Sequence, residues 1–187
     1  MKRLFDLFIG SMLLVFLAIP MILIVVTIRS TSKGSSLYWS ERVGKNNIIF
    51  RMPKFRSMII NTPAVATHLL DDPDLYMSPF GDFLRRTSLD ELPQLFSVLK
   101  GDMSFVGPRP ALFNQEDLIT LRTNMGIDKL LPGITGWAQV NGRDQLSIAD
   151  KVNFDVEYMR RQSFWFDIKI LLIKTLIKVI NNSDIKH

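Results

Sequence analysis

The chain has 187 residues, a net charge of +5 and an isoelectric point of about 9.6, and 47% of its residues are hydrophobic. It contains no cysteine, which excludes a disulfide framework, a thiolate zinc site and a cysteine nucleophile. The only histidines are His68 and His187, and no neighbour of His68 suggests a Ser-His-Asp triad. The length suits one domain. The net positive charge favours binding to anionic lipid or to phosphorylated substrates over binding to nucleic acid, because no basic run is interleaved with aromatic residues.

The first predicted element is an apolar helix. No charge occurs from Leu7 to Ile28, about 22 residues or about 33 Å of helix, which is enough to cross a bilayer. The run is too long for a signal peptide and no small-residue cleavage site follows it. A spanning helix remains an alternative, but Pro20 interrupts the run. Basic residues also flank both ends, which favours a helix that bends and returns to the cytoplasmic side: Lys2, Arg3, Arg29 and Lys33.

Two short strands are predicted next, after a polar linker at residues 30–36. They are Leu37–Val43 and residues 48–50, joined by residues 44–47. Lys54 and Arg56 then flank Phe55 in an extended segment that could place both cations on one side. Taken alone, this pattern is typical of a solvated strand face. Residues 61–80 predict a short helix and a surface loop, and their acidic cluster lacks the spacing of a calcium loop.

The stretch from residue 84 to residue 110 carries the main candidate site. Four apolar residues recur in it at helical spacing: Leu92, Leu95, Phe96 and Leu99. Gly101 is typical of the end of that helix. Pro93 sets the start, because a helix capped by Ser88 would lose a backbone bond at Pro93. With Asp90 as the N-cap, Pro93 falls in the first turn, where its missing N–H costs nothing.

Acidic and basic residues gather around this predicted helix start. Asp90 and Glu91 lie at it, Arg85 and Arg86 precede it, and Arg109 follows on a stiff segment between two prolines. Carboxylates, guanidiniums and a helix N-terminus together favour a site for a phosphorylated substrate. Taken alone, Asp90 would more often be a helix cap and nothing else.

The last third of the chain predicts two helices around a turn-rich segment. Residues 114–123 predict a polar surface helix, and residues 132–143 predict tight turns around a small apolar core, without a Walker or dinucleotide motif. Residues 164–180 predict a helix with Asp167 and Lys174 on one face and Trp165, Leu172 and Leu176 on the other. That pattern suits a membrane interface, and a helix packed on the core is an equal alternative.

Three blocks of the chain resemble one family. They are ERVGKNNIIFRMPKFRSM, SLDELPQLFSVLKGDMSFVGPRP and PGITGWAQVNGR. They are similar to blocks of the bacterial sugar transferases, the monotopic phosphoglycosyl transferases that start glycan assembly on a polyprenol phosphate. The resemblance covers roughly residues 1 to 175 and indicates the small single-domain form. It implies a re-entrant membrane helix hinged at Pro20, although Ile19 stands where the family has a serine before the proline.

The resemblance implies transfer of a phospho-sugar from a UDP-sugar to undecaprenyl phosphate, with release of UMP and with Mg²⁺ as cofactor. Asp90 would be the nucleophile, would hold the phospho-sugar as an acyl phosphate and would contact the metal. Glu91 would be the second catalytic residue, as a metal neighbour or a proton acceptor. Substrate contacts are implied for five basic residues: Lys54, Arg56, Arg85, Arg109 and Arg143. The partners would be the UDP-sugar, undecaprenyl phosphate and membrane lipid, with no nucleic acid.

The predicted fold class is therefore α+β and mostly helical. A re-entrant membrane helix at residues 1–29 precedes a catalytic domain at residues 30–187, with a short β-hairpin and amphipathic interfacial helices, on the cytoplasmic face of the bacterial inner membrane. A non-catalytic, membrane-tethered module that binds nucleotide-sugars is the alternative, and it would not need Asp90 and Glu91. A conventional glycosyl transferase is disfavoured, because the Asp-x-Asp triplet at residues 72–74 has no strand ahead of it.

Overall fold

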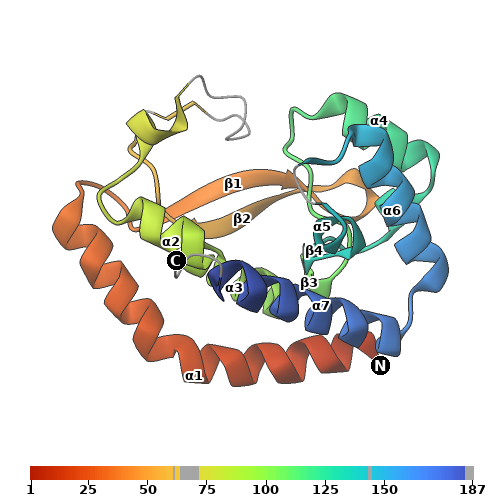
Figure 1. Ribbon diagram of the computed structural model, residues 1–187, viewed down its shortest axis with the longest axis horizontal. Helices are drawn as coiled ribbons and strands as arrows, with labels where there is room; N and C mark the ends of the chain where they lie inside the picture. The colour runs from red at the N-terminus through yellow and green to blue at the C-terminus, as the bar shows by residue number, and fades with distance from the viewer. Residues whose placement is uncertain (61, 64–71, 143–144, 184–187) are drawn as a thin grey trace.

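The protein is mostly helical, with two small sheets, as the α+β prediction requires (Figure 1). The computed structural model describes residues 1–60, 62–63, 72–142 and 145–183. Its helices are α1 Lys2–Thr31, α2 Gly81–Thr87, α3 Gln94–Lys100, α4 Glu116–Asn124, α5 Trp137–Val140, α6 Ile148–Arg161 and α7 Phe164–Ser183. Its strands are β1 Leu37–Val43, β2 Ile49–Phe55, β3 Ser104–Val106 and β4 Gly133–Thr135.

Helix α1 wraps along one side of the molecule and bends near its middle (Figure 1). The helix continues through Pro20, which lies in its interior and cannot donate a backbone hydrogen bond to the preceding turn. By length and composition α1 is able to cross a membrane. The bend lets both halves of α1 follow the curved surface of the rest of the molecule.

One face of α1 packs on the molecule along both halves, and the other is exposed. Four residues of the first half contact the main core cluster: Phe5, Ile9, Leu13 and Leu17. Four residues of the second half belong to or contact a second cluster: Met21, Ile24, Val25 and Ile28. The exposed face is apolar too: Leu4, Phe8, Val15, Phe16, Ile19, Ile22 and Leu23. Helix α1 is therefore a packed part of the fold whose outer side carries exposed apolar side chains.

Strands β1 and β2 form an antiparallel hairpin, from the pair Leu37–Phe55 to the pair Val43–Ile49. The first predicted strand is confirmed, but the second was predicted too short and in fact runs to Phe55. Pro53 looks like a strand breaker in the sequence, yet a two-stranded sheet has only edges, where proline is tolerated. The longer strand places Lys54 in the sheet, opposite Tyr38.

Strands β3 and β4 are parallel and bring two distant blocks of the sequence together. Their backbones approach so closely that glycine is required: a Cβ on Gly107 would lie 2.3 Å from the Leu131 carbonyl oxygen, and one on Gly136 would lie 2.2 Å from the Gly107 carbonyl oxygen. This packing fixes the backbone that leads into Arg109.

Helix α7 packs on the core, which is one of the two alternatives that the sequence left open. Phe166 and Ile170 lie in the main core, and Asp167, predicted on a polar face, is buried. The Tyr158 hydroxyl donates to Asp167 at 2.7 Å, and Lys2 of α1 forms an ion pair with it. Asp167, which was predicted to share a face with Lys174, can be buried because a cation and a hydroxyl satisfy its charge inside the fold. The predicted apolar face of the helix is exposed: Trp165, Leu172 and Leu176.

Candidate active site

Asp90 and Glu91 lie in a 3₁₀ turn, Leu89–Glu91, immediately before α3. The prediction that Asp90 caps the following helix is wrong, because α3 begins at Gln94 and its capping position is Pro93. The chain already turns at Leu89, after Ser88 adopts a left-handed conformation with φ of 59°. Asp90 therefore has no capping role, and its carboxylate remains available for other contacts.

Glu91 is held between two cations. Its Oε1 accepts hydrogen bonds from Lys54 Nζ at 3.1 Å and from Arg109 Nη2 at 3.2 Å. Burial raises the pKa of Glu91, but the charges of Arg109 and Lys54 and their hydrogen bonds outweigh it and hold that pKa below its usual range. Glu91 therefore stays ionised and links strand β2 to the Arg109 segment.

Asp90 differs from its neighbour in both contacts and acidity. Its nearest cation is Lys54, whose Nζ lies 3.9 Å from Oδ2, and among the described residues its oxygens accept no hydrogen bond. Only 7% of Asp90 is exposed. Burial raises the pKa of Asp90, while the charge of Lys54 opposes the rise. Such a desolvated carboxylate without hydrogen bonds would, when ionised, be a strong nucleophile for its type.

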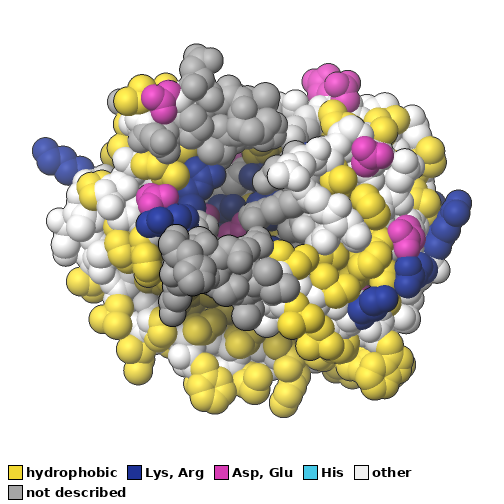
Figure 2. All heavy atoms as spheres, in the orientation of Figure 1, with side chains coloured by type: hydrophobic (Ala, Val, Ile, Leu, Met, Phe, Trp, Pro, Cys, Tyr) yellow, Lys and Arg dark blue, Asp and Glu magenta, His cyan; other side chains and the backbone are white. Residues whose placement is uncertain are grey.

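A cavity of about 360 Å³ lies beside Asp90. Its lining includes Tyr38, Ser40 and Arg42 from β1, Lys54 from β2, Arg56 and Met58 after β2, Arg85 from α2, and Leu112. Figure 2 shows a hollow on this face with basic and acidic side chains inside it, and a band of hydrophobic side chains along the lower edge of the molecule. The cavity is therefore rich in cations and suits an anionic ligand.

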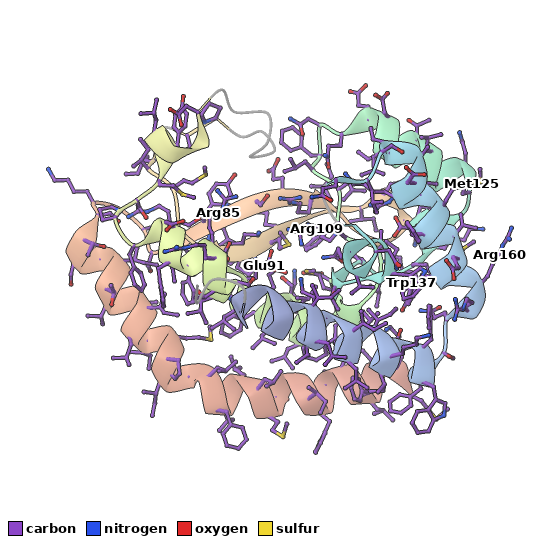
Figure 3. All side chains as sticks on the ribbon, in the orientation of Figure 1. Arg85, Glu91, Arg109, Met125, Trp137 and Arg160 are labelled. Carbon is purple, nitrogen blue, oxygen red and sulfur yellow. The ribbon has the colours of Figure 1, made fainter. Side chains whose placement is uncertain are left out.

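The structure brings most of the predicted site residues together. Lys54, Arg56, Arg85 and Asp90 line the cavity, and Arg109 reaches the same cluster through Glu91. Figure 3 shows Arg85, Glu91 and Arg109 beside the β1–β2 hairpin. Arg143 lies outside the described residues, so its predicted substrate contact stays a prediction.

Arg56 lines the cavity but is also bound elsewhere. Its Nη2 donates to Ser32 Oγ at 2.7 Å, which ties it to the end of α1. Lys54 turns instead to Glu91 and Asp90. The two cations predicted to share one side therefore serve different contacts, because Lys54 lies within β2 and Arg56 follows the end of that strand.

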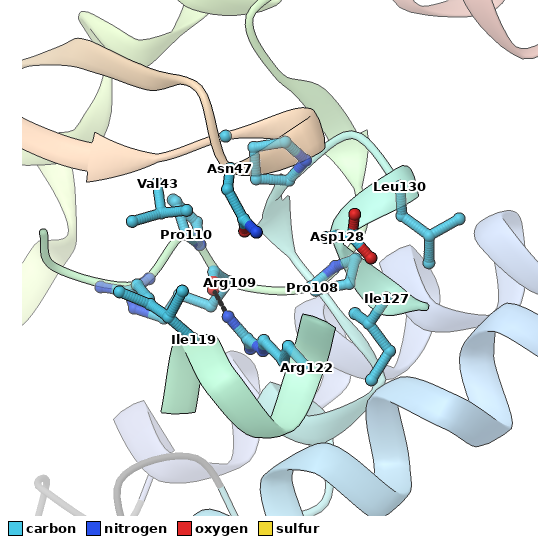
Figure 4. A pocket seen from close by; sticks show the side chains of 13 residues that line it. Val43, Asn47, Pro108, Arg109, Pro110, Ile119, Arg122, Ile127, Asp128 and Leu130 are labelled. Atoms are coloured by element: carbon cyan, nitrogen blue, oxygen red, sulfur yellow. Dashed lines mark hydrogen bonds between the residues drawn. The ribbon is translucent and has the colours of Figure 1, made fainter. Parts of the chain in front are cut away.

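Sequence reasoning missed Arg122, which holds the backbone of Arg109. Arg122 Nη1 donates to the Arg109 carbonyl oxygen at 2.7 Å (Figure 4). Its Nε and Nη2 donate to Asp155 Oδ2 at 2.9 and 2.6 Å. A cavity of about 30 Å³ lies beside this contact. Arg122 follows the buried Leu118 by one helical turn, a spacing that could have marked it as inward-facing.

Arg42 was also missed. It lines the cavity from β1, on the same face of the strand as Tyr38 and Ser40. The alternation of these residues in the sequence could have placed Arg42 on the face that carries Lys54, had the second strand been predicted at its full length.

The chain resembles known sugar transferases over nearly its whole length. A family model described as bacterial sugar transferase matches residues 1–182. The chain is 37% identical to the uncharacterized sugar transferase EpsL of Bacillus subtilis, over 100% of this chain and 91% of that protein. It is 37% identical to the UDP-glucose:undecaprenyl-phosphate glucose-1-phosphate transferase of Escherichia coli and 38% identical to the undecaprenyl-phosphate galactose phosphotransferase of Salmonella typhimurium. These matches cover 98% and 91% of this chain but 41% and 39% of the two relatives, so the chain spans about two fifths of their length.

Proposed function

The chain belongs to the bacterial sugar transferase family, and from that premise we propose that it transfers a sugar phosphate from a UDP-sugar to undecaprenyl phosphate. The name of the relative from Escherichia coli supports both the donor and the acceptor class, and that of the relative from Salmonella typhimurium supports the acceptor class. The observation that carries the proposal is the contrast between two adjacent carboxylates: Glu91 is bound by two cations, whereas Asp90 has no hydrogen bond among the described residues and lines the cavity.

In the proposed first step, Asp90 attacks the donor. A carboxylate oxygen of Asp90 forms a bond to the β-phosphorus of the UDP-sugar, and the bond from that phosphorus to the bridging oxygen breaks. UMP leaves with the bridging oxygen and the bonding electron pair, and the sugar phosphate remains on Asp90 as an acyl phosphate. Lys54 and Arg85 line the same cavity and would stabilise the negative charge on the transferring phosphate.

In the proposed second step, the acceptor displaces Asp90. A phosphate oxygen of undecaprenyl phosphate attacks the phosphorus of the acyl phosphate, and the bond between phosphorus and the Asp90 oxygen breaks. Asp90 regains its carboxylate, and the product is undecaprenyl-diphosphate-sugar. Glu91 keeps Lys54 and Arg109 in place through both steps, since it contacts both cations.

Magnesium is the cofactor that the proposed reaction implies. Within residues 1–60, 62–63, 72–142 and 145–183, no group of three or more acidic, histidine or cysteine side chains is placed to hold a metal. Mg²⁺ commonly binds one or two carboxylates together with substrate phosphates and water, and the Asp90 carboxylate at the cavity fits that donor set. When bound there with the donor diphosphate, Mg²⁺ would neutralise phosphate charge.

The proposed location is the cytoplasmic face of the inner membrane, with α1 inserted in one leaflet. Support comes from the exposed apolar face of α1, from the packing of both its halves on one folded body, and from the basic residues at both ends. A polyprenol phosphate carries its reacting group at headgroup depth, so a site beside such a helix would reach it.

The decisive test is Asp90→Asn. Asparagine is nearly isosteric and neutral, so the variant should stay folded while turnover to UMP collapses. Wild-type enzyme incubated with a panel of UDP-sugars and Mg²⁺, without acceptor, should gain the mass of one phospho-sugar, which peptide mapping should place on Asp90. Adding undecaprenyl phosphate should remove the adduct.

Asp82→Asn is the matched control, because Asp82 is an exposed acid on α2 that pairs with Arg86. It should retain parental turnover and adduct formation. A folded Asp90→Asn protein with near-parental turnover, or an adduct on another residue, would make the mechanism wrong. Binding of UDP-sugar without any UMP release would favour the non-catalytic alternative.

A further inference from the structure

Arg42 is held firmly at the wall of the cavity. Its Nε donates to Ser40 Oγ at 2.9 Å, and its Nη1 donates to the Pro110 carbonyl oxygen at 3.1 Å. The backbone is fixed as well, because the Val43 amide donates to the Ala111 carbonyl oxygen at 3.0 Å. The guanidinium is therefore preorganised, and a ligand that binds it would restrict little further side-chain freedom.

The charge of Arg42 has no counter-ion among the described residues. Both of its hydrogen-bond acceptors are neutral, and it forms no ion pair there. Glu91, whose charge acts on Arg42, is itself bound by Lys54 and Arg109. Burial and the neighbouring charge of Arg109 lower the pKa of Arg42 to about 10, so it stays protonated near neutral pH. A partly buried cation of this kind gains most from an anionic ligand.

Arg42 and Asp90 line the same cavity at different places. Lys54, which lies 3.9 Å from Asp90, is paired with Tyr38 across the hairpin, whereas Arg42 lies four residues further along β1, opposite Phe50. The charges that shift the pKa of Asp90 are those of Lys54, Glu91, Arg85 and Arg109. The charge of Arg42 nevertheless reaches Lys54, whose pKa it helps to lower, and both residues line the cavity. A ligand whose reacting phosphate lies at Asp90 and Lys54 would therefore extend toward Arg42.

We propose that Arg42 binds the second phosphate of the donor, the one that leaves on the nucleotide. A diphosphate bound in the cavity would then have one phosphate at Asp90, Lys54 and Arg85 and the other at the fixed guanidinium of Arg42. The identity of the donor rests on the proposed function, but the anion site rests on the contacts of Arg42 alone. Arg42 thereby acts as a substrate-binding residue that selects diphosphates over monophosphates.

The test uses inorganic diphosphate and inorganic phosphate as probes, with calorimetry on the full chain in a metal-free buffer. Wild-type protein should bind diphosphate more tightly than phosphate. Arg42→Gln should weaken diphosphate binding by about tenfold to a hundredfold, the effect of losing a charge-assisted hydrogen bond, and should bring the two affinities close together. Phosphate binding at Lys54 and Arg85 should change far less.

Arg51→Gln is the matched control, because Arg51 lies on the same hairpin but is exposed and stacks on Trp39 at 5.7 Å from the ring centre. It should bind both probes as wild type does. Thermal unfolding would establish that each variant is folded. If Arg42→Gln does not fold, Arg42→Lys takes its place and should lose several-fold in diphosphate preference, because lysine cannot reproduce the guanidinium fork.

The proposal is overturned if wild type shows no preference for diphosphate, or if the folded Arg42 variant keeps that preference. It is also overturned if Arg51→Gln loses as much as Arg42→Gln. If the wild-type enzyme transfers sugar phosphate from a UDP-sugar but Arg42→Gln keeps the preference for diphosphate, the proposed function stands and this inference is wrong. If Arg42→Gln loses the preference for diphosphate but no UDP-sugar supports transfer by the wild-type enzyme, the anion site is supported and the proposed reaction is not.

Discussion

Asp90 and Glu91 are neighbours in the chain, but their surroundings drive their acidities apart. Two hydrogen-bonded cations lower the pKa of Glu91, whereas burial raises that of Asp90. Adjacent carboxylates with opposite shifts are suited to different tasks. Glu91 organises the cations, and Asp90 carries the proposed chemistry.

Lys54 should set the pH dependence of the reaction. A nucleophilic Asp90 must be ionised, so kcat/KM should rise with pH through its raised pKa and fall on acidification. Because the charge of Lys54 opposes the effect of burial, Lys54→Gln should raise the pKa of Asp90 further and move the acid limb to higher pH. The measurement is a pH profile of UMP release for each protein.

Lys100→Gln is the control for that profile, since Lys100 is an exposed lysine paired with Asp102. Its acid limb should coincide with that of wild type. Lower activity of Lys54→Gln without any movement of the acid limb would contradict the electrostatic role assigned to Lys54.

At the scale of elements, the Arg109 segment is held from two sides. The tight glycine packing of β3 and β4 fixes the backbone before it, and Arg122 of α4 binds the Arg109 carbonyl while paired with Asp155 of α6. Helices α4 and α6 are remote in sequence from Glu91, yet they support the cation that contacts it.

Arg122→Ala should destabilise the protein by about 3 to 5 kcal/mol, because it leaves the buried Asp155 without its partner. Replacing Arg122 with Met and Asp155 with Leu together should recover most of that stability. Turnover of the double variant should remain low, since nothing then holds the Arg109 carbonyl. Denaturant unfolding measures the stability, and UMP release measures the turnover. A stable double variant with parental turnover would show that the contact of Arg122 with the Arg109 carbonyl has no positioning role.

At the scale of the whole molecule, both halves of α1 pack on the same folded body. A helix that crossed the bilayer would have to give up one of these contacts, so both ends should lie on the same side. The chain has no cysteine, which makes single-cysteine labelling clean. Cysteines introduced next to Met1 and at Lys33 should both resist a membrane-impermeant reagent added to intact cells and react after lysis.

Pro20→Ala provides the companion variant in the same labelling assay. Restoring the backbone N–H should favour a straighter helix, which fits the curved surface less well and should increase labelling near Met1 from outside. Reaction of the Met1-side cysteine in intact cells with Pro20 unchanged would refute the re-entrant arrangement.

Much of the site was predictable from the sequence because its residues fall in short blocks with strong local signals. Asp90, Glu91, Lys54 and Arg85 were identified, and the structure brings them together. The role of Asp90 as a cap was wrong, because a 3₁₀ turn precedes α3 and helix-capping rules do not anticipate it.

The remaining errors concern long-range contacts. Asp167 has the sequence signature of a surface acid, and only the approach of Lys2 and Tyr158 makes its burial tolerable. Helical spacing and strand alternation could have shown which way Arg122 and Arg42 face, but no local pattern encodes their contacts with the Arg109 and Pro110 carbonyl oxygens. The fold class followed from the family resemblance together with the helix and strand patterns of the sequence, but the way that α1 wraps around the molecule depends on tertiary packing.

In the proposed reaction, the exposed apolar face of α1 would also determine how the enzyme meets its acceptor. A protein held by that face moves with the lipid in two dimensions, and undecaprenyl phosphate shares the same plane. Encounters then depend on the number of acceptor molecules per area of lipid and not on their amount per volume of solution. The proposed donor would arrive from the aqueous side in three dimensions, so its concentration would be counted per volume of solution and that of the acceptor per area of lipid. Diluting the acceptor with an inert lipid should lower the rate of the second step and leave the rate of the first step unchanged.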